Sequence, residues 1–261
     1  MGRNDGWNWP SVALTGASSG LGTAFALALA RPGRRLHLAG RDPARLAAVA
    51  DRCRPGAGAR VTEAAFDVRD ADAARGWIAA AGPLDLAIAN AGVSAGPGKG
   101  GGEDAEAVAR IFAVNLAGAL NTALPALEQM RGQPPGPGGI RGRVAVVASI
   151  AAFVASPGAP AYCASKAALQ RWAEATDATT RHDGVRVHAL CPGFIRTPMT
   201  AHNDFPMPGL MTPEEAARKA LDGIARGRGR IAYPWFLYAG ARLAGALPVR
   251  WLSAAPAKGR G

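Results

Sequence analysis

Residues 11–22 read Ser11-Val12-Ala13-Leu14-Thr15-Gly16-Ala17-Ser18-Ser19-Gly20-Leu21-Gly22, and this stretch decides the fold. A short apolar run is followed by a turn with three glycines, and an alanine-rich, helix-prone segment begins directly after it. In such a unit Gly16 permits a tight turn, Gly20 lets the backbone approach a pyrophosphate at the helix N-terminus, and Gly22 permits close helix–strand contact. The spacing is G-x-x-x-G-x-G rather than G-x-G-x-x-G, so an ordinary turn between a strand and a helix is the alternative.

The alternation of strands and helices continues along the chain. Short apolar runs indicate buried strands at Ser11–Leu14, Leu36–Ala39, Val61–Ala65, Leu84–Ala89, Val144–Ala148 and Val185–Leu190, and a weaker one at Arg230–Tyr233. Alanine-rich stretches between them indicate helices at Leu21–Ala30, Pro43–Arg52, Ala71–Ala80, Asp104–Met130 and Ala161–His182. This order predicts an α/β fold: a single Rossmann-type, doubly wound parallel sheet of about seven strands, with helices on both faces.

One domain is expected over residues 1–261, with a core at about 10–232 and an apolar C-terminal extension at 233–261. Gly132–Gly142 is rich in proline and glycine and is typical of a surface loop. Pro192–Met211 contains four prolines and is long enough to be a mobile lid. Thr212 is placed to cap the helix that follows.

The chain carries a net charge of +11, and only four of its 30 basic residues are lysines. A basic protein is suited to nucleic acid, an anionic membrane or a phosphorylated ligand. The arginines are scattered without interleaved aromatic residues, so no nucleic-acid partner is expected. Cys53, Cys163 and Cys191 have no metal-ligand spacing, so no metal site is expected and a cytoplasmic location is the simplest fit. The segment Met1–Pro10 lacks the apolar core of a signal peptide.

Tyr162 and Lys166 are four residues apart in a helical stretch, and Ser149 lies thirteen residues before the tyrosine. A spacing of four places the phenol and the ammonium on one face of a helix. A free tyrosine has a pKa near ~10 and a neighbouring cation favours the phenolate, so the pair is suited to moving a proton at a carbonyl or an alcohol. Taken alone, such a pair is more often a half-buried ring beside a solvated amine.

Several motifs together resemble the classical short-chain dehydrogenases/reductases in order and spacing. They are Thr15–Gly22, Asn90-Ala91-Gly92, Asn115, Ser149, Tyr162–Lys166 and Pro192-Gly193. The resemblance covers residues 10–230, and several independent motifs in register argue against a chance match. It implies an NAD(P)-dependent oxidoreductase that transfers a hydride between the nicotinamide and a carbonyl or secondary alcohol.

The resemblance implies a catalytic set made of Asn115, Ser149, Tyr162 and Lys166. Ser149 would bind the substrate oxygen, with Ser156 as its main rival, and Tyr162 would be the general acid in reduction and the base in oxidation. Lys166 would lower the pKa of the tyrosine and hold the nicotinamide ribose. Asn115 would lie within a helix, where asparagine is mildly unfavourable, and would support a water relay to Lys166.

The resemblance also implies a cofactor site along the ends of successive strands. Asp67-Val68 would meet the adenine edge, Asn90 to Gly92 would lie against the adenine ribose, and Pro192–Thr197 would hold the nicotinamide carboxamide. The expected cofactor-binding residues, besides Tyr162 and Lys166, are Gly16, Ser18, Ser19, Gly20, Leu21, Gly22, Arg41, Asp67, Val68, Asn90, Ala91, Gly92, Pro192, Gly193, Ile195 and Thr197. For each loop, plain structure without a ligand is the alternative.

The end of the second predicted strand bears on the choice of cofactor. Dinucleotide folds that prefer NAD carry an acid there, which bonds the ribose 2′-hydroxyl. Here Gly40 takes that place and Arg41 follows, and a guanidinium can grip a 2′-phosphate. The sequence therefore predicts NADP(H) over NAD(H). Asp42 leaves two alternatives open, since it could cap the next helix or turn toward the ribose.

The segment Tyr233–Leu252 is apolar and aromatic, but its prolines and arginines make it a poor transmembrane helix. It could line the substrate cleft, pack on a partner subunit, or make peripheral contact with a membrane through residues 233–252. The resemblance implies a homodimer or homotetramer that associates through the helices holding Asn115 and Tyr162.

The leading prediction is an NADP-dependent oxidoreductase acting on a small-molecule carbonyl or alcohol, with Tyr162 as its general acid/base. The alternative is a catalytically silent NAD(P)-binding regulatory protein of the same fold, and the intact catalytic set argues against it. Epimerase and dehydratase relatives usually have a longer substrate domain than this chain can hold. An apolar substrate pocket is suggested by Phe153, Val154, Phe194, Phe205, Met207 and Met211, which do not identify the substrate.

Overall fold

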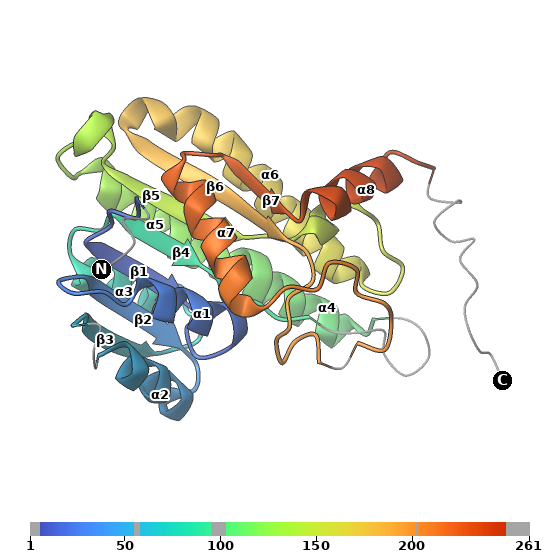
Figure 1. Cartoon of the computed structure of the whole chain (residues 1–261), viewed down its shortest axis with the longest axis horizontal. Helices are drawn as coiled ribbons and strands as arrows, with labels where there is room; N and C mark the ends of the chain where they lie inside the picture. The colour runs from blue at the N-terminus through green and yellow to red at the C-terminus, as the bar shows by residue number, and fades with distance from the viewer. Residues whose placement is uncertain (1–5, 55–57, 95–102, 202, 249–261) are drawn as a thin grey trace.

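A seven-stranded parallel sheet forms the centre of the molecule, and helices cover both of its faces (Figure 1). The computed structural model describes residues 6–54, 58–94, 103–201 and 203–248. The strands are β1 (Ser11–Thr15), β2 (Arg35–Gly40), β3 (Arg60–Ala65), β4 (Leu86–Ala89), β5 (Gly142–Val147), β6 (Val185–Pro192) and β7 (Arg230–Tyr233). They lie in the order β3-β2-β1-β4-β5-β6-β7, which confirms the predicted Rossmann-type fold.

The helices follow the strands in the predicted alternation. They are α1 (Gly20–Leu29), α2 (Pro43–Cys53), α3 (Ala71–Ala81), α4 (Ala105–Phe112), α5 (Ala119–Arg131), α6 (Pro160–Thr180), α7 (Pro213–Ala225) and α8 (Trp235–Gly245). Apolar side chains of α1, α2 and α7 pack on one face of the sheet, and those of α3, α5 and α6 pack on the other. Because both faces are covered, β1 and β4 are buried at every residue, which explains the apolar run Val12–Leu14 in β1 and the apolar sequence of β4.

The order in which successive strands are added to the sheet reverses at β1. β1 lies between β2 and β4: Val12 is paired with Leu36 of β2 on one side and with Leu86 of β4 on the other. In open parallel sheets this reversal leaves a crevice beyond the carboxyl ends of the two central strands, where ligands bind. The glycine turn after β1 and Asn90 after β4 both lie at this crevice.

The helix predicted at Asp104–Met130 is interrupted. A π-helical segment, Ala113–Gly118, separates α4 from α5. The combined helix Ala105–Arg131 is long and apolar enough to cross a membrane, with a mean hydropathy of 1.4 over its best window, but α5 packs its small side chains against the sheet. In the described structure, 39% of that window is buried.

The C-terminal extension contains a helix that the sequence did not predict. α8 follows β7 directly and projects beyond the carboxyl edge of the sheet (Figure 1). The remainder of the predicted extension, residues 249–261, lies outside the described part of the chain.

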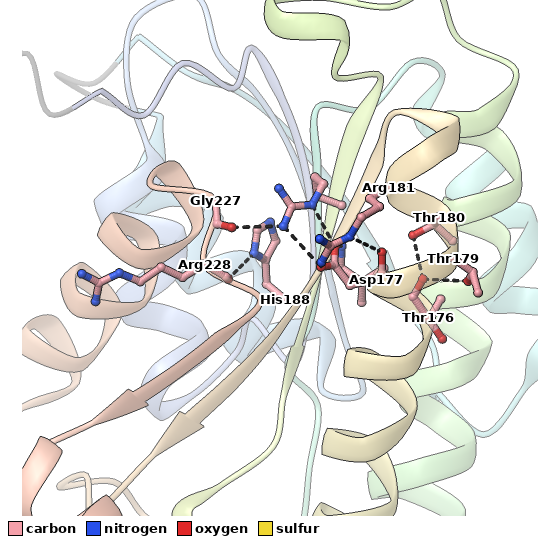
Figure 2. A network of polar contacts seen from close by, with 10 residues as sticks. Thr176, Asp177, Thr179, Thr180, Arg181, His188, Gly227 and Arg228 are labelled. Carbon is pink, nitrogen blue, oxygen red and sulfur yellow. Dashed lines mark hydrogen bonds and ion pairs between the residues drawn. The ribbon is translucent and has the colours of Figure 1, made fainter.

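A polar network lies at the opposite edge, where β6 and β7 begin (Figure 2). Asp177 of α6 is 2% exposed, and its carboxylate accepts hydrogen bonds from Arg186 Nε at 2.9 Å, Arg181 at 2.5 Å and the backbone N–H of Val187 at 2.9 Å. Burial by itself would raise the pKa of Asp177, but these hydrogen bonds and charges more than offset it, so the pKa is lowered.

His188 is fully buried in the same network. Its Nδ1 donates a hydrogen bond of 2.7 Å to the Arg228 carbonyl oxygen, whereas Nε2 has no partner within the described structure. Burial lowers the pKa of His188 to about 4, and the charges of Arg186 and Arg143 act in the same direction. The fold therefore holds this imidazole in its neutral form, at the edge of the sheet farthest from the crevice.

Candidate active site

The turn after β1 has the backbone that its glycines predicted. Gly16 and Gly20 adopt φ values of +66° and +52°, a region that glycine enters without strain. A Cβ atom on Gly22 would collide with the carbonyl oxygen of Gly16, so no side chain fits at this position. Helix α1 has no side-chain cap, which leaves its first N–H groups available to an anion at the crevice.

Asn90 fixes this turn from the neighbouring strand. Its side-chain amide donates hydrogen bonds of 3.1 Å to the carbonyl oxygens of both Thr15 and Gly16. The Asn90 backbone N–H donates to the Thr15 hydroxyl at 3.2 Å. A Cβ on Gly16 would lie 2.8 Å from the Asn90 amide nitrogen and from Ala91 Cα, which adds a second requirement for glycine. The predicted Asn90–Gly92 motif therefore shapes the glycine turn as well as lining the crevice.

One cleft runs from the glycine turn to the residues after β6. Its lining includes every predicted cofactor-binding residue: Gly16, Ser18, Ser19, Gly20, Leu21, Gly22, Arg41, Asp67, Val68, Asn90, Ala91, Gly92, Tyr162, Lys166, Pro192, Gly193, Ile195 and Thr197. Ser149 lines the same cleft, and Asn115 does not. The fold thus brings together residues that are far apart in the sequence, and their roles as cofactor ligands stay a prediction.

Tyr162 and Ser149 meet where α6 begins and β5 ends. Tyr162 lies in the first turn of α6, and Ser149 caps the short helix that follows β5 by accepting a 3.1 Å hydrogen bond from the Ala151 N–H. The Ser149 hydroxyl also donates a 3.5 Å hydrogen bond to the Pro192 carbonyl oxygen, and its hydrogen bonding to the phenol acts to lower the pKa of Tyr162. The rival Ser156 does not line the cleft. The geometry therefore favours Ser149 as the partner of Tyr162.

Lys166 is held one helical turn beyond Tyr162. Its ammonium donates a 2.7 Å hydrogen bond to the Val147 carbonyl oxygen and lies 5.7 Å from the centre of the Tyr162 ring. The side chain is 4% exposed, so the amine is not the solvated group of the alternative interpretation. Burial lowers the pKa of Lys166 to about 8.

Lys166 was expected to lower the pKa of Tyr162, but the structure shows that this pKa is raised. Burial raises the pKa of this phenol, and the hydrogen bond with Ser149 opposes the rise only in part. The lysine lies over the ring and bonds a carbonyl, so its charge is not directed at the phenol oxygen. In the protein alone, Tyr162 is therefore held protonated, as a proton donor requires.

Asn115 is buried in the π-helical segment and is not an exposed polar residue. Its Oδ1 accepts a 2.8 Å hydrogen bond from the Val93 N–H, and its Nδ2 donates to the Val93 carbonyl at 2.9 Å and to Ser165 Oγ at 3.2 Å. The amide thus joins the segment after β4 to α6, the helix that carries Tyr162. The water relay to Lys166 expected of Asn115 stays a prediction.

Glu103 contacts the catalytic helix and was missed in the sequence. Helix α6 has no side-chain cap of its own, because Ala159 precedes it. Glu103 supplies the acceptor instead, since its Oε2 accepts a 2.8 Å hydrogen bond from the Ala161 N–H. An acidic side chain is favoured at a helix N-terminus. No local motif reports this contact, because the two residues are 58 positions apart.

The end of the cleft beside β2 resolves the two alternatives for Asp42. Its carboxylate caps α2 by accepting a 3.0 Å hydrogen bond from the Arg45 N–H. Asp42 lines the cleft with Arg41 and with Arg45, a second guanidinium that was not among the predicted residues. A Cβ on Gly40 would lie 3.0 Å from Ser18 Oγ, so the space at this position is filled by the serine hydroxyl.

Asp67, predicted to meet the adenine edge, is already engaged. Its carboxylate accepts hydrogen bonds from the Arg69 side chain at 2.8 and 3.1 Å and from the Arg69 N–H at 2.9 Å. The side-chain hydrogen bonds with Arg69 lower the pKa of Asp67. The carboxylate therefore lines the cleft in its charged form.

The segment predicted as a lid closes the other side of the cleft. Ile195 pairs with Met211 in an isolated bridge, which ties the two ends of the segment together. A Cβ on Gly20 would lie 3.0 Å from Thr197, so the lid reaches the glycine turn. Met211, proposed for an apolar pocket, is 7% exposed and belongs to the core instead.

A family model described as short chain dehydrogenase matches residues 10–206. The chain belongs to this family of oxidoreductases. An uncharacterized oxidoreductase of Myxococcus xanthus (strain DK1622) is 39% identical over 250 residues, which cover 92% of this chain and 94% of that protein.

Two solved structures of the family are also similar to the chain. A short chain dehydrogenase/reductase from Burkholderia phymatum, in complex with NAD, has a TM-score of 0.79 and 27% identity and covers 89% of this chain and 92% of its own. A short-chain dehydrogenase from Sphingobium yanoikuyae, in complex with NADPH, has a TM-score of 0.76 and 26% identity, with coverages of 92% and 96%.

Proposed function

We propose that this oxidoreductase uses NADP(H) to interconvert a carbonyl compound and a secondary alcohol, with Tyr162 as the general acid/base. The observation that carries the proposal is the cleft itself. The glycine turn and the Tyr162–Ser149 pair line the same cleft, so a dinucleotide on the turn can present its far end to the phenol. The neighbours from Burkholderia phymatum and Sphingobium yanoikuyae hold NAD and NADPH, which supports a nicotinamide cofactor without choosing between the two.

The residues of this chain transfer the proton and stabilise the substrate oxygen. When bound, the nicotinamide supplies or accepts the hydride at the substrate carbon. In reduction, the Tyr162 hydroxyl donates its proton to the carbonyl oxygen, and Ser149 Oγ stabilises that oxygen by a hydrogen bond as negative charge develops on it. In oxidation, the same phenol oxygen takes the proton back from the alcohol. The Lys166 ammonium donates to the Val147 carbonyl oxygen and lies 5.7 Å from the centre of the Tyr162 ring, so its charge favours the phenolate through space, without a direct bond to the phenol oxygen.

Substitution of the phenol tests this mechanism. Tyr162→Phe should lower kcat for reduction of a ketone by about 10²- to 10⁴-fold, because general acid catalysis contributes that range. Binding of NADPH, followed by quenching of its fluorescence, should stay close to that of the unchanged protein. Ser149→Ala should also lower kcat, whereas Ser156→Ala provides the matched control outside the cleft. Full activity of Tyr162→Phe would refute the mechanism.

The adenosine end of the cleft supports NADP(H) over NAD(H). Gly40 offers no carboxylate to a ribose 2′-hydroxyl, and the Asp42 carboxylate is occupied in capping α2. Arg41 and Arg45 both line the cleft at this end. Two guanidinium groups favour a 2′-phosphate through charge-assisted hydrogen bonds.

Kinetics with both cofactors test the preference. Arg41→Ala should lower kcat/KM for NADPH by about 10- to 100-fold and leave that for NADH nearly unchanged, because a hydrogen bond to a charged group contributes about 1.5–3 kcal/mol. Arg52→Ala, at the exposed far end of α2, is the control. Equal use of the two cofactors by the unchanged protein would contradict the proposal.

The remaining expectations stay predictions. A homodimer or homotetramer and a cytoplasmic location have no observation for or against them. The silent regulatory protein has no observation in its favour. None of the six residues suggested for an apolar pocket lines the cleft. Phe194 and Phe205 form an edge-to-face pair at 5.9 Å, and Phe153 packs against Tyr238 of α8 at 5.0 Å.

A further inference from the structure

One face of α8 is apolar and exposed. Trp235 is 76% exposed and Leu243 is 69% exposed, and with Ala239 between them they form a stripe at a spacing of four residues. Phe236 and Leu247 extend this apolar surface, with exposures of 47% and 39%. We call these four large side chains, Trp235, Phe236, Leu243 and Leu247, the α8 patch. Exposed apolar surface concentrated in this way marks an interaction site.

The opposite face of α8 is fixed to the body of the protein. The Tyr238 hydroxyl accepts a 2.6 Å hydrogen bond from Arg230, whose guanidinium is also paired with Glu174 of α6 at 2.8 Å. The Tyr238 ring packs edge-on against Phe153 at 5.0 Å. Because these contacts hold the inner face, α8 cannot rotate to bury Trp235 and Leu243, so the α8 patch is a stable feature of the surface.

The α8 patch adjoins the lid. A Cβ on Gly209 would lie 2.8 Å from the Phe236 ring, so the end of the lid packs directly against α8. Leu210, the next residue, is 36% exposed and continues the apolar surface. Both elements lie beyond the carboxyl edge of the sheet, as the ribbon shows (Figure 1). The apolar surface is therefore on the same side of the molecule as the mouth of the cleft.

The charge of this part of the chain selects the kind of partner. From Trp235 to the last residue the sequence contains four basic residues and no acidic residue. Arg242 lies on α8 itself and is exposed. A second copy of the same surface would bring like charges together and supply no acid to pair with them. Nucleic acid would satisfy the charges, but it would leave the exposed Leu243 and Leu247 without an apolar environment.

We propose that the α8 patch docks on the surface of an anionic phospholipid bilayer. Trp235 and Leu243 enter the boundary between headgroups and acyl chains, and Arg242 stays at the level of the lipid phosphates. Each basic side chain near such a surface adds to the attraction. In this orientation the end of the lid, at Gly209 and Leu210, lies beside the bilayer. Membrane docking does not depend on the reaction proposed above.

Sedimentation with vesicles tests the proposal on the full chain. Vesicles that contain phosphatidylglycerol should bind the protein, and vesicles of phosphatidylcholine alone should bind it weakly. The double substitution Trp235→Ser, Leu243→Ser should lower the partition coefficient on anionic vesicles by about tenfold or more, because burial of each apolar side chain contributes to binding. Leu124→Ser on α5 removes a side chain with 52% exposure far from α8 and is the matched control.

Three further readouts make the outcome decisive. Salt should weaken binding to the anionic vesicles, as expected for contacts between exposed charges. The far-ultraviolet circular dichroism spectrum should show that the double variant is folded, and its reduction of a water-soluble ketone should equal that of the unchanged protein. Equal vesicle binding by the unchanged protein and the double variant would overturn the proposal. The proposal would also be overturned if the double substitution left vesicle binding unchanged and altered only the oligomeric state or only the binding of DNA.

Discussion

Replacement of His188 by asparagine should remove a specific part of the acid sensitivity of this fold. The new side chain has no ionisable group, while its amide can donate to the Arg228 carbonyl in place of Nδ1. In the native protein, burial lowers the pKa of His188 to about 4 from the ordinary 6.5. As the pH falls, His188 of the unfolded chain binds a proton near pH 6.5, whereas His188 of the folded protein binds one only near pH 4. The free energy of unfolding therefore decreases as the pH falls from about 6.5 to about 4.

The size of the effect follows from the two pKa values. At pH 5 the histidine of the unfolded chain is almost fully protonated and that of the folded protein is mostly neutral. Linkage then gives a loss of about 2 kcal/mol relative to pH 7.5. Carboxylates such as Asp177 also respond to acid, but their contribution is present in both proteins and cancels in the comparison.

Urea unfolding at the two pH values measures the difference. The native protein should lose about 2 kcal/mol more than His188→Asn between pH 7.5 and 5, even if the variant is less stable at both. His182→Asn, at an exposed position after α6, is the control and should behave like the native protein. Identical losses in the native protein and in His188→Asn would refute the assignment of a buried neutral imidazole.

Three further outcomes concern the cleft. Gly22→Ala should abolish NADPH binding measured by fluorescence, because its methyl group would collide with the Gly16 carbonyl oxygen that shapes the turn; binding unchanged from that of the native protein would contradict this. Glu103→Ala should lower the free energy of unfolding by about 1 kcal/mol, because a helix cap is lost, and it should also lower kcat. Glu103→Gln keeps an acceptor for the Ala161 N–H, so this variant should retain most of the stability and most of the kcat. The kcat for ketone reduction should fall as the pH rises through about 8, where Lys166 loses its charge; a profile that stays level well above that pH would show that the ammonium is not needed.

The fold was predictable because its central strands leave little ambiguity. Val12–Leu14 of β1 and all of β4 are apolar and buried on both faces, so they stand out from the alanine-rich helices. The expectation of a buried strand at Val61–Ala65 was wrong, because β3 is an edge strand with no fully buried residue. The site was predictable for a related reason. Parallel strands end at one edge, so the residues directly after β1, β4 and β5 were certain to meet once the strand order was known.

The features that the sequence did not reveal depend on contacts over long distances. The π-helical turn around Asn115 is fixed by hydrogen bonds to Val93, 22 positions away. The N-terminal cap of α6 comes from Glu103, and no motif near α6 in the sequence indicates that this distant residue supplies it. The pKa of Tyr162 depends on how far the ring is buried and on where Lys166 points, and neither follows from a spacing of four.

The contact between position 40 and Ser18 constrains how cofactor preference can change during evolution. A Cβ atom added at Gly40 would lie 3.0 Å from the Ser18 hydroxyl oxygen, so an acid there requires Ser18 to rotate or shift by a few tenths of an ångström. A change at position 40 is therefore coupled to the conformation of residue 18. An acid at position 40 should be accommodated more readily in a lineage that also carries a smaller residue at position 18.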